Sequence, residues 1–133
     1  IKDYNLPQEE DKGSIIIVIA TNAPLDNRQL KRLAKRAELG VARTGSYGGH
    51  GSGDVMVAFS TANKVLQSPT YMEEMVVRFN DAYLNSFFKA TVDATEEAIL
   101  NSMLHAKALK SYNGTEYKSL MEYKSLFEDL LEK

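Results

Sequence analysis

Residues 13–21, Gly13-Ser14-Ile15-Ile16-Ile17-Val18-Ile19-Ala20-Thr21, decide how this chain folds. Apolar and mostly β-branched side chains fill the stretch from Ile15 to Ala20 without a polar residue between them. Such a run is typical of a strand that is covered on both faces, because a half-exposed strand would alternate apolar and polar residues. We therefore expect a strand from Ser14 to Thr21 inside a sheet.

A helix is predicted directly after this strand. Pro24 interrupts the strand, and Asp26 or Asn27 can cap a helix by accepting a hydrogen bond from a free backbone N–H. The helix should extend to about Ala42. Its apolar residues recur at spacings of three and four and form one stripe of Leu30, Leu33, Ala34, Ala37 and Val41. The rest of the helix is strongly basic, and we interpret it as a solvated face.

A glycine-rich segment, residues 44–54, follows the predicted helix with five glycines in eleven residues. Glycines allow backbone conformations that are closed to other residues and can bring backbone amides close to a ligand. A second apolar strand is predicted immediately after it, from Val55 to Ser60. Ser14 and Asp54 therefore both lie where a predicted strand begins.

The second half of the chain is predicted to be mainly helical. Apolar residues at helical spacing predict helices at Tyr71–Tyr83, Leu84–Leu109 and Tyr117–Leu131, and Asn113-Gly114 marks a turn. The order of strand, helix, strand and helices indicates a layered α/β fold. Two strands cannot make a covered sheet alone, so we expect further strands from another chain or another copy.

Composition limits the classes of function. The chain has 133 residues, about one domain, with 16 basic and 18 acidic residues, so no strong net charge would attract nucleic acid or a membrane. It has no cysteine, which excludes a disulfide framework, a thiolate zinc site and a cysteine nucleophile. No apolar run is long enough to span a bilayer. We expect a soluble, cytoplasmic protein.

The first thirteen residues differ from the rest. They are mostly polar, start at Ile1 without a methionine, and end at Gly13. We expect residues 1–13 to be a tail or linker and the chain to be a piece of something longer. Residues 14–133 would then form the folded region.

Ser14 is the candidate nucleophile. If the bond between Gly13 and Ser14 were cut, Ser14 would carry both a hydroxyl and a free α-amine. An α-amine has a pKa of about 7.7 to 8.0, so near neutral pH part of it could accept the hydroxyl proton. The alternative is that Gly-Ser simply opens a strand, since such dipeptides are common in loops.

A wider pattern resembles one known family, the DmpA/BapA-type L-aminopeptidase/D-esterase and β-aminopeptidase enzymes. The segments that carry the resemblance, in order, are GSIIIVIATNAPL (13–25), QLKRLA (29–34), GVARTG (40–45), GSGD (51–54), AFST (58–61) and ATVDATEEA (90–98). They extend over most of residues 13–109. The resemblance is to the C-terminal, nucleophile-bearing β-subunit of that family.

The resemblance implies a precursor that cleaves itself between Gly13 and Ser14 into two subunits, which stay together in a layered αββα sandwich. The missing N-terminal α-subunit would complete the fold. Ser14 would attack a peptide, amide or ester carbonyl and form an acyl-enzyme, which water hydrolyses to release an N-terminal residue. No metal or organic cofactor is implied. Oligomers of αβ units are usual in the family, so we expect a homo-oligomer.

By the same resemblance, Ser52 and Asp54 match a serine and an acidic residue beside the nucleophile. Their expected roles are to orient Ser14 and to help move its proton. Some family members have glutamate at the position of Asp54, so a direct contact with Ser14 and a contact through Ser52 both stay open. Without the resemblance, both residues are ordinary for a glycine-rich loop. An asparagine of the missing subunit should stabilise the oxyanion.

Other sites are less favoured by the residues. His50 lies near Ser52, but a serine that uses its own amine needs no imidazole, and His50 with His105 is poor support for a zinc site without cysteine. The glycine-rich segment lacks a following Gly-Lys-Ser/Thr and precedes a strand, unlike a phosphate-binding loop. The basic residues between Arg28 and Arg43 have no interleaved aromatics, so we expect no nucleic-acid partner.

Two alternatives to a self-processed serine aminopeptidase stay open. One is an unprocessed, inactive relative that only assembles or binds. The other is an acyltransferase of the ornithine acetyltransferase type, although those enzymes characteristically use threonine as the nucleophile. The residue and stereochemistry of the substrate are not predicted by the sequence.

Overall fold

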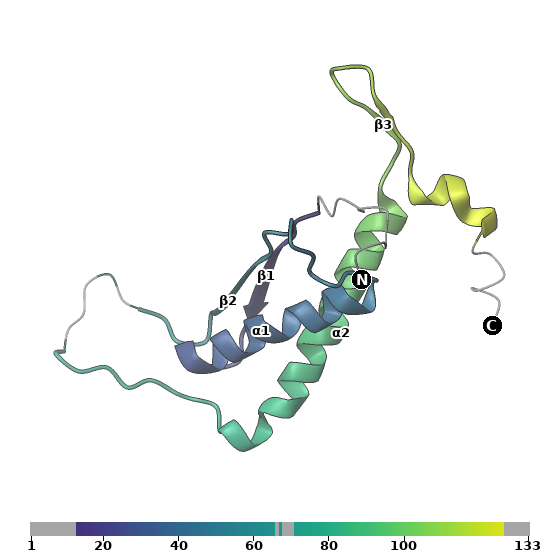
Figure 1. Ribbon diagram of the computed structural model, residues 1–133. Coiled ribbons are helices and arrows are strands. Elements are labelled where there is room, and N and C mark those ends of the chain that lie inside the picture. The colour runs from purple at the N-terminus through teal and green to yellow at the C-terminus, as the bar shows by residue number, and fades with distance from the viewer. Residues whose placement is uncertain (1–12, 66, 68–70, 127–133) are drawn as a thin grey trace, which may run out of the picture.

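The computed structural model describes residues 13–65, 67 and 71–126, and it is built around a parallel pair of strands. Strand β1 (Ile16–Thr21) pairs with β2 (Val55–Ser60), from Ile16 opposite Val55 to Thr21 opposite Ser60. Helix α1 (Asn27–Arg43) connects them, as a parallel pair requires, because the chain must return to the edge where it started. The predicted α/β class and both strands are confirmed (Figure 1).

The N-terminus of α1 is held by a reciprocal cap. The Asp26 side chain accepts from the Gln29 amide at 2.7 Å, and the Gln29 side chain accepts from the Asp26 amide at 3.0 Å. Gln29 is fully buried, and its side-chain amide also donates to the Phe79 carbonyl at 2.8 Å and to Asp81 at 2.6 Å. The predicted cap is confirmed, and it also fastens α1 to the segment that precedes the second long helix.

Helix α2 (Leu84–His105) crosses α1 at very short range, at Gly40. A β-carbon on Gly40 would lie 2.6 Å from the Thr95 β-carbon and 2.6 Å from the Val92 carbonyl oxygen. Glycine costs about 1 kcal/mol in a helix relative to alanine, but only glycine lets the two backbones approach this closely. The buried core cluster consists of Leu25, Leu33 and Leu84.

The basic side of α1 is exposed at Arg28, Lys31, Lys35 and Arg43, as predicted, whereas Arg32 and Arg36 are half-buried. Its arginines also contact other parts of the chain. Arg28 contacts Asp81 at 2.6 Å, and Arg43 contacts Asp93 at 2.7 Å on α2. The guanidinium groups of two further arginines lie over the ring of one phenylalanine, at 5.0 and 4.0 Å from its centroid: Arg32 and Arg36 over Phe88. These arginines connect α1 to α2 and to the 3₁₀ turn that precedes it, Asp81–Tyr83, because a planar cation can stack and form ion pairs along the same surface.

These contacts lower the pKa of two carboxyl groups. Hydrogen bonds from Gln29 and then Arg28 lower the pKa of Asp81 below its usual value. Hydrogen bonds from Lys89 and then Arg43 do the same for Asp93. Both carboxylates therefore stay ionised further into acid than an unperturbed aspartate would.

The predicted helix at Tyr71–Tyr83 is wrong. The described residues from 71 to 80 form no helix, and only the short 3₁₀ turn at Asp81–Tyr83 precedes α2. Met72 and Met75, in the first part of the predicted helix, are fully exposed and pack against nothing in the described chain, whereas Phe79 near its end packs against the core. A short helix depends on such packing. The Asn63 side chain instead bonds both the N–H and the C=O of Val77.

The end of the described chain also differs from the prediction. Helix α2 ends at His105 instead of Leu109, and β3 (Leu109–Lys110) pairs antiparallel with β4 (Glu116–Tyr117). The predicted turn is confirmed, with Gly114 at φ 88°. A 3₁₀ segment at Leu120–Leu126 stands where a helix at Tyr117–Leu131 was predicted. Tyr117, the first residue of that predicted helix, instead pairs with Leu109 in β3. Residues 127–133 lie outside the described residues.

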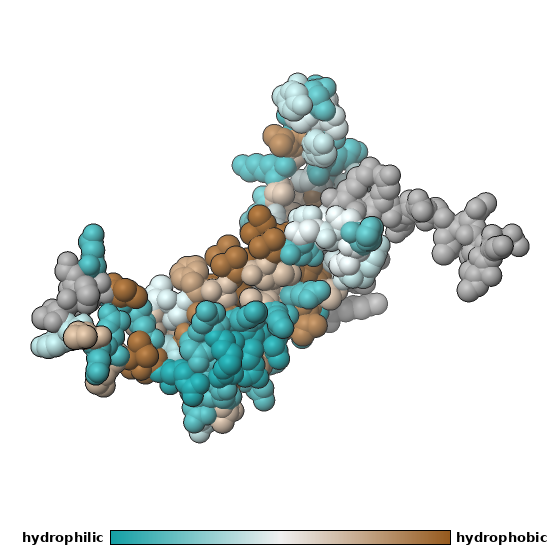
Figure 2. Space-filling view, turned by 60° about the vertical axis from the view of Figure 1, so that its left-hand side comes forward, coloured by the Kyte–Doolittle hydropathy of each residue, from teal (hydrophilic) through white to brown (hydrophobic). Residues whose placement is uncertain are grey.

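The helices cover only one face of the strand pair. Alternate residues of β1 and β2 are half-buried on the helix side, whereas Ile16 and Val18 on the other side are 75% and 62% exposed, with Val55, Val57 and Phe59 beside them. Figure 2 shows hydrophobic side chains gathered across the middle of the molecule. Within the described residues β1 is thus covered on one face, not two, and its completion by further strands stays a prediction. None of the described helices is long and apolar enough to span a membrane.

We predict that Gly40→Ala destabilises the protein. The new methyl group meets the Val92 carbonyl, which cannot rotate away, so the helices must separate. Overpacking of this kind costs about 1 to 3 kcal/mol of unfolding free energy, more than the gain in helix propensity. Urea unfolding measures the change, with Lys35→Ala on the exposed side of α1 as the control. An unchanged midpoint for Gly40→Ala would contradict the close crossing.

We also predict a pH-dependent effect of Asp81→Asn. Because the pKa of Asp81 is lowered in the folded state, its stabilising contribution is complete above the unfolded value of about 3.9 and is lost as pH falls through the folded value. The melting temperature of Asp81→Asn should therefore be lower at pH 7, with the difference shrinking below about pH 4. Glu116→Gln in the exposed pair with Lys110 is the control and should change little.

Candidate functional site

The candidate site lies at the edge of the sheet where both strands begin. The Val55 amide donates to the Ile15 carbonyl at 2.9 Å, which continues the ladder one residue before β1. The Ile15 amide in turn donates to Asp54 Oδ1 at 2.9 Å. Because β1 and β2 are parallel, their starts meet at one edge of the sheet, so Ser14 and Asp54 come close together. The hydrogen bond from Ile15 to Asp54 joins residues that are 39 positions apart in the sequence.

Ser52 shares the same carboxylate oxygen. Its hydroxyl donates to Asp54 Oδ1 at 2.6 Å, and its backbone amide donates to the Gly49 carbonyl at 2.9 Å, which closes a turn in the glycine-rich segment. Asp54 thus accepts from the Ser52 hydroxyl and from the backbone next to Ser14. It has hydrogen bonds to Ser52 and Ile15, and none to the Ser14 hydroxyl among the described residues.

Ser14 is exposed, and its hydroxyl oxygen accepts a hydrogen bond from the Gly53 amide at 3.0 Å. The glycine-rich segment was expected to bring backbone amides near a ligand, and Gly53 is the residue whose amide does so for Ser14. The register could have identified Gly53: two residues before the pair Ile16–Val55 are Ser14 and Gly53. That register is not visible in the sequence, because either strand could slide relative to the other.

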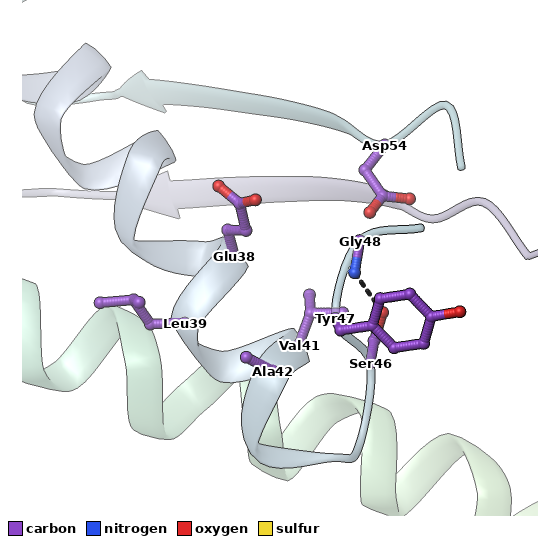
Figure 3. Close-up of a pocket in the computed structure, with 8 residues that line it drawn as sticks. All are labelled: Glu38, Leu39, Val41, Ala42, Ser46, Tyr47, Gly48 and Asp54. Carbon is purple, nitrogen blue, oxygen red and sulfur yellow. Dashed lines mark hydrogen bonds between the residues drawn. The ribbon is translucent and has the colours of Figure 1, made fainter. Parts of the chain in front are cut away.

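Two adjoining hollows lie beside Ser14. The first is lined by Gly13, Ser14, Ile15, Val41, Ser46, Ser52 and Asp54. The second, drawn in Figure 3, shares Val41, Ser46 and Asp54 with the first and extends along α1 to Glu38, Leu39 and Ala42, with Tyr47 and Gly48 on the loop. Their linings contain two carboxylates and no basic side chain. Val41 and Ser46 line both hollows and were not predicted as site residues from the sequence.

The two histidines are not part of this cluster. His50 is exposed in the turn, and no hydrogen bond within residues 13–65 joins it to Ser14 or Ser52. His105 Nδ1 lies 2.8 Å from the Asn101 carbonyl at the end of α2. In the part of the chain that the structure describes, no group of three or more His, Cys, Asp or Glu residues could hold a metal ion.

The arrangement places one hydroxyl, on Ser14, in contact with a fixed amide donor and next to a carboxylate-bound hydroxyl. A comparison with protein families identifies the family to which a chain with this arrangement belongs. Residues 2–117 match the model of Peptidase family S58. The chain belongs to Peptidase family S58. This confirms the resemblance to the DmpA/BapA-type enzymes.

Curated relatives of this S58 chain are named as aminopeptidases. It is 49% identical over 102 residues to the β-peptidyl aminopeptidase BapA of Sphingosinicella microcystinivorans, which covers 77% of this chain and 26% of that protein. It is 39% identical over 112 residues to the BapA of Sphingosinicella xenopeptidilytica, over 84% of this chain and 27% of that protein. The chain therefore spans about a quarter of the length of the curated relatives it matches.

A solved structure that is similar to this chain gives the fold. The L-aminopeptidase D-Ala-esterase/amidase of Ochrobactrum anthropi, described as a prototype for the serine aminopeptidases and a new variant among the Ntn hydrolase fold, superposes with a TM-score of 0.75. It is 35% identical and covers 86% of this chain and 33% of its own. The S58 chain therefore has part of an Ntn hydrolase fold. This confirms the expectation that the chain is part of a layered α/β sandwich.

We predict that Asp54→Ala loosens the start of β1. Without the carboxylate, the Ile15 amide loses its acceptor, so its hydrogen exchange should become faster, while the amide of Ile19, which faces β2 in the middle of the ladder, should change little. Ser52→Ala is the control, because it leaves the bond between Ile15 and Asp54 in place. Exchange measured residue by residue separates the two variants; equal protection of Ile15 in both would contradict the role given to Asp54.

Proposed function

We propose that this chain is the nucleophile-bearing region of a serine aminopeptidase that cleaves its own precursor between Gly13 and Ser14. The observation that carries the proposal is the Ser14 hydroxyl, held by the Gly53 amide at the edge where Ser52 and Asp54 converge. The family and the names of the relatives support an aminopeptidase. Residues 1–13 would precede the cut, and residues 14–133 would form the β-subunit region.

Self-cleavage would begin with attack of Ser14 Oγ on the carbonyl carbon of Gly13. As the new C–O bond forms, the bond between that carbon and the Ser14 nitrogen breaks, and the proton from the hydroxyl ends on the nitrogen. Water then hydrolyses the ester, which leaves a carboxylate on Gly13 and both a free amine and a free hydroxyl on Ser14. Gly13 lines the same hollow as Ser14, which suits this intramolecular step.

The same groups would then act on substrate. The freed amine of Ser14 accepts the hydroxyl proton while Oγ attacks the substrate carbonyl, and the proton passes to the leaving amine. Water hydrolyses the resulting acyl-enzyme. Asp54 and Ser52 act as positioning residues: the carboxylate fixes the backbone next to Ser14 and favours the protonated amine that forms in the attack.

A complete enzyme needs the part of the precursor that this chain lacks. We propose that an N-terminal α-subunit supplies the oxyanion donor and covers the bare face of β1 and β2, whose Ile16 and Val18 are exposed. A protein should not leave such a face in water. On this proposal the αβ units assemble further into a cytoplasmic homo-oligomer, substrates are peptides, amides or esters, and the chain alone is inactive.

The test is Ser14→Ala in the full-length precursor. We expect it to remain one chain by intact mass and to lose hydrolysis of an aminoacyl p-nitroanilide by a factor on the order of 10³ or more, because both steps lose their nucleophile. Ser86→Ala, at an exposed serine of α2, should process and hydrolyse normally. Hydrolysis that survives in Ser14→Ala would disprove the assignment.

The behaviour of the wild-type precursor distinguishes the aminopeptidase from the two alternatives, an inactive relative and an acyltransferase. An uncut Gly13–Ser14 bond after long incubation would favour an inactive relative that only assembles. Acyl transfer to an added amine in preference to water would favour an acyltransferase. A cut chain that releases free amino acid from the anilide supports the aminopeptidase.

A further inference from the structure

Gly53 has an amide that is fixed in place before any substrate binds. On one side of it, Ser52 is held by the Gly49 carbonyl and by Asp54. On the other side, β2 begins at Val55, whose amide bonds the Ile15 carbonyl. Between these anchors the Gly53 N–H points at the Ser14 hydroxyl oxygen at 3.0 Å. A donor held in this way needs no reorganisation when charge develops on its acceptor.

The absence of a side chain at Gly53 has no explanation in packing or in backbone conformation. Gly45 and Gly48 have φ of 103° and 61°, where other residues are strained, and Gly40 allows the helix crossing. Gly53 is outside the left-handed region, and a β-carbon on it would meet one atom within 4 Å, Ser14 Oγ at 3.6 Å. That distance is an ordinary contact. The atom affected by a side chain here is therefore the candidate nucleophile itself.

We propose that Gly53 is a catalytic residue with two separable roles: its N–H steers Ser14 Oγ, and its missing side chain leaves room beside Oγ for the acyl group of the substrate. This inference rests on Ser14 as the nucleophile. Residue 53 then limits how bulky the acyl group can be at the carbon under attack.

The two roles follow from what attack requires. The carbonyl carbon must approach Oγ to about 3 to 3.5 Å along a defined direction before the bond forms. A methyl group 3.6 Å from Oγ occupies part of the space around that oxygen, and the substituents of a branched acyl group need the same space. As the hydroxyl proton leaves, the Gly53 N–H stabilises the negative charge on Oγ.

Self-cleavage separates the roles. There the acyl carbon belongs to Gly13, which carries no side chain and is already attached to Ser14. The N–H is needed in self-cleavage as much as in hydrolysis, because Oγ is the nucleophile in both. The free space beside Oγ is needed chiefly for an external acyl group.

Gly53→Ala in the full-length precursor tests the space. It keeps the N–H and adds the methyl group, so self-cleavage should still go to completion. The kcat/KM for a valyl p-nitroanilide should fall by about tenfold or more, while that for a glycyl p-nitroanilide should fall far less. Gly51→Ala, at an exposed glycine that is also outside the left-handed region, should match wild type on both substrates. Equal kcat/KM losses on both substrates, or none, would overturn the role of the space.

An amide-to-ester exchange tests the N–H. Glycolic acid replaces Gly53 by nonsense suppression, which removes the donor without adding a side chain. Self-cleavage and hydrolysis of both anilides should then slow together, by about tenfold or more, as for the loss of one hydrogen bond to a charged oxygen. Circular dichroism and melting temperature check that the precursor is folded. Wild-type rates in the folded ester variant would overturn the role of the amide.

The two proposals fail in different ways. If Ser14→Ala retains activity, the nucleophile is wrong and this inference falls with it. If Ser14→Ala is inactive while the Gly53 variants process and hydrolyse as wild type does, the nucleophile stands and only the roles of Gly53 are overturned.

Discussion

The parallel pairing of β1 with β2 is the constraint on which the candidate site depends. It places Ile16 opposite Val55, so the residues before each strand, Ser14 and Gly53, lie opposite each other as well. The Gly53 amide can then donate to Ser14 Oγ, and the Asp54 carboxylate can accept from the Ile15 amide. A shift of the register by one residue would turn the side chains to the other face and separate these groups. The geometry of the site is thus a property of strand pairing.

Helix α1 connects the two strands, packs on one face of the strand pair and helps to hold the strands in that register. It must span the full length of the strands in the reverse direction, and its two ends are fixed differently. At the N-terminal end, the buried Gln29 bonds Asp26, Phe79 and Asp81. Towards the C-terminal end, Gly40 brings α1 against α2. Polar bonds have strict geometry and a backbone crossing is incompressible, so both ends resist sliding.

The sequence was sufficient where a single segment determines its own structure. The β-branched run before Thr21 and the cap at Asp26 were both predictable, since strand propensity and capping are local. The helix expected around Met72 did not form, because Met72 and Met75 find no partner surface in the described chain. The family resemblance pointed to Ser52 and Asp54, but the bond from Asp54 to the Ile15 backbone and the contact of Gly53 with Ser14 depend on register and became visible only in the fold.

The bare face of the strand pair has a consequence for the order of events in the cell. Ile16, Val18 and Val55 offer a flat hydrophobic surface that would adhere to any similar surface it met, including another newly made copy. On the proposed maturation, a chain released too early would be free to aggregate. Covalent attachment to the rest of the precursor keeps the intended covering nearby at high effective concentration, so the uncut bond works as a tether until docking is complete.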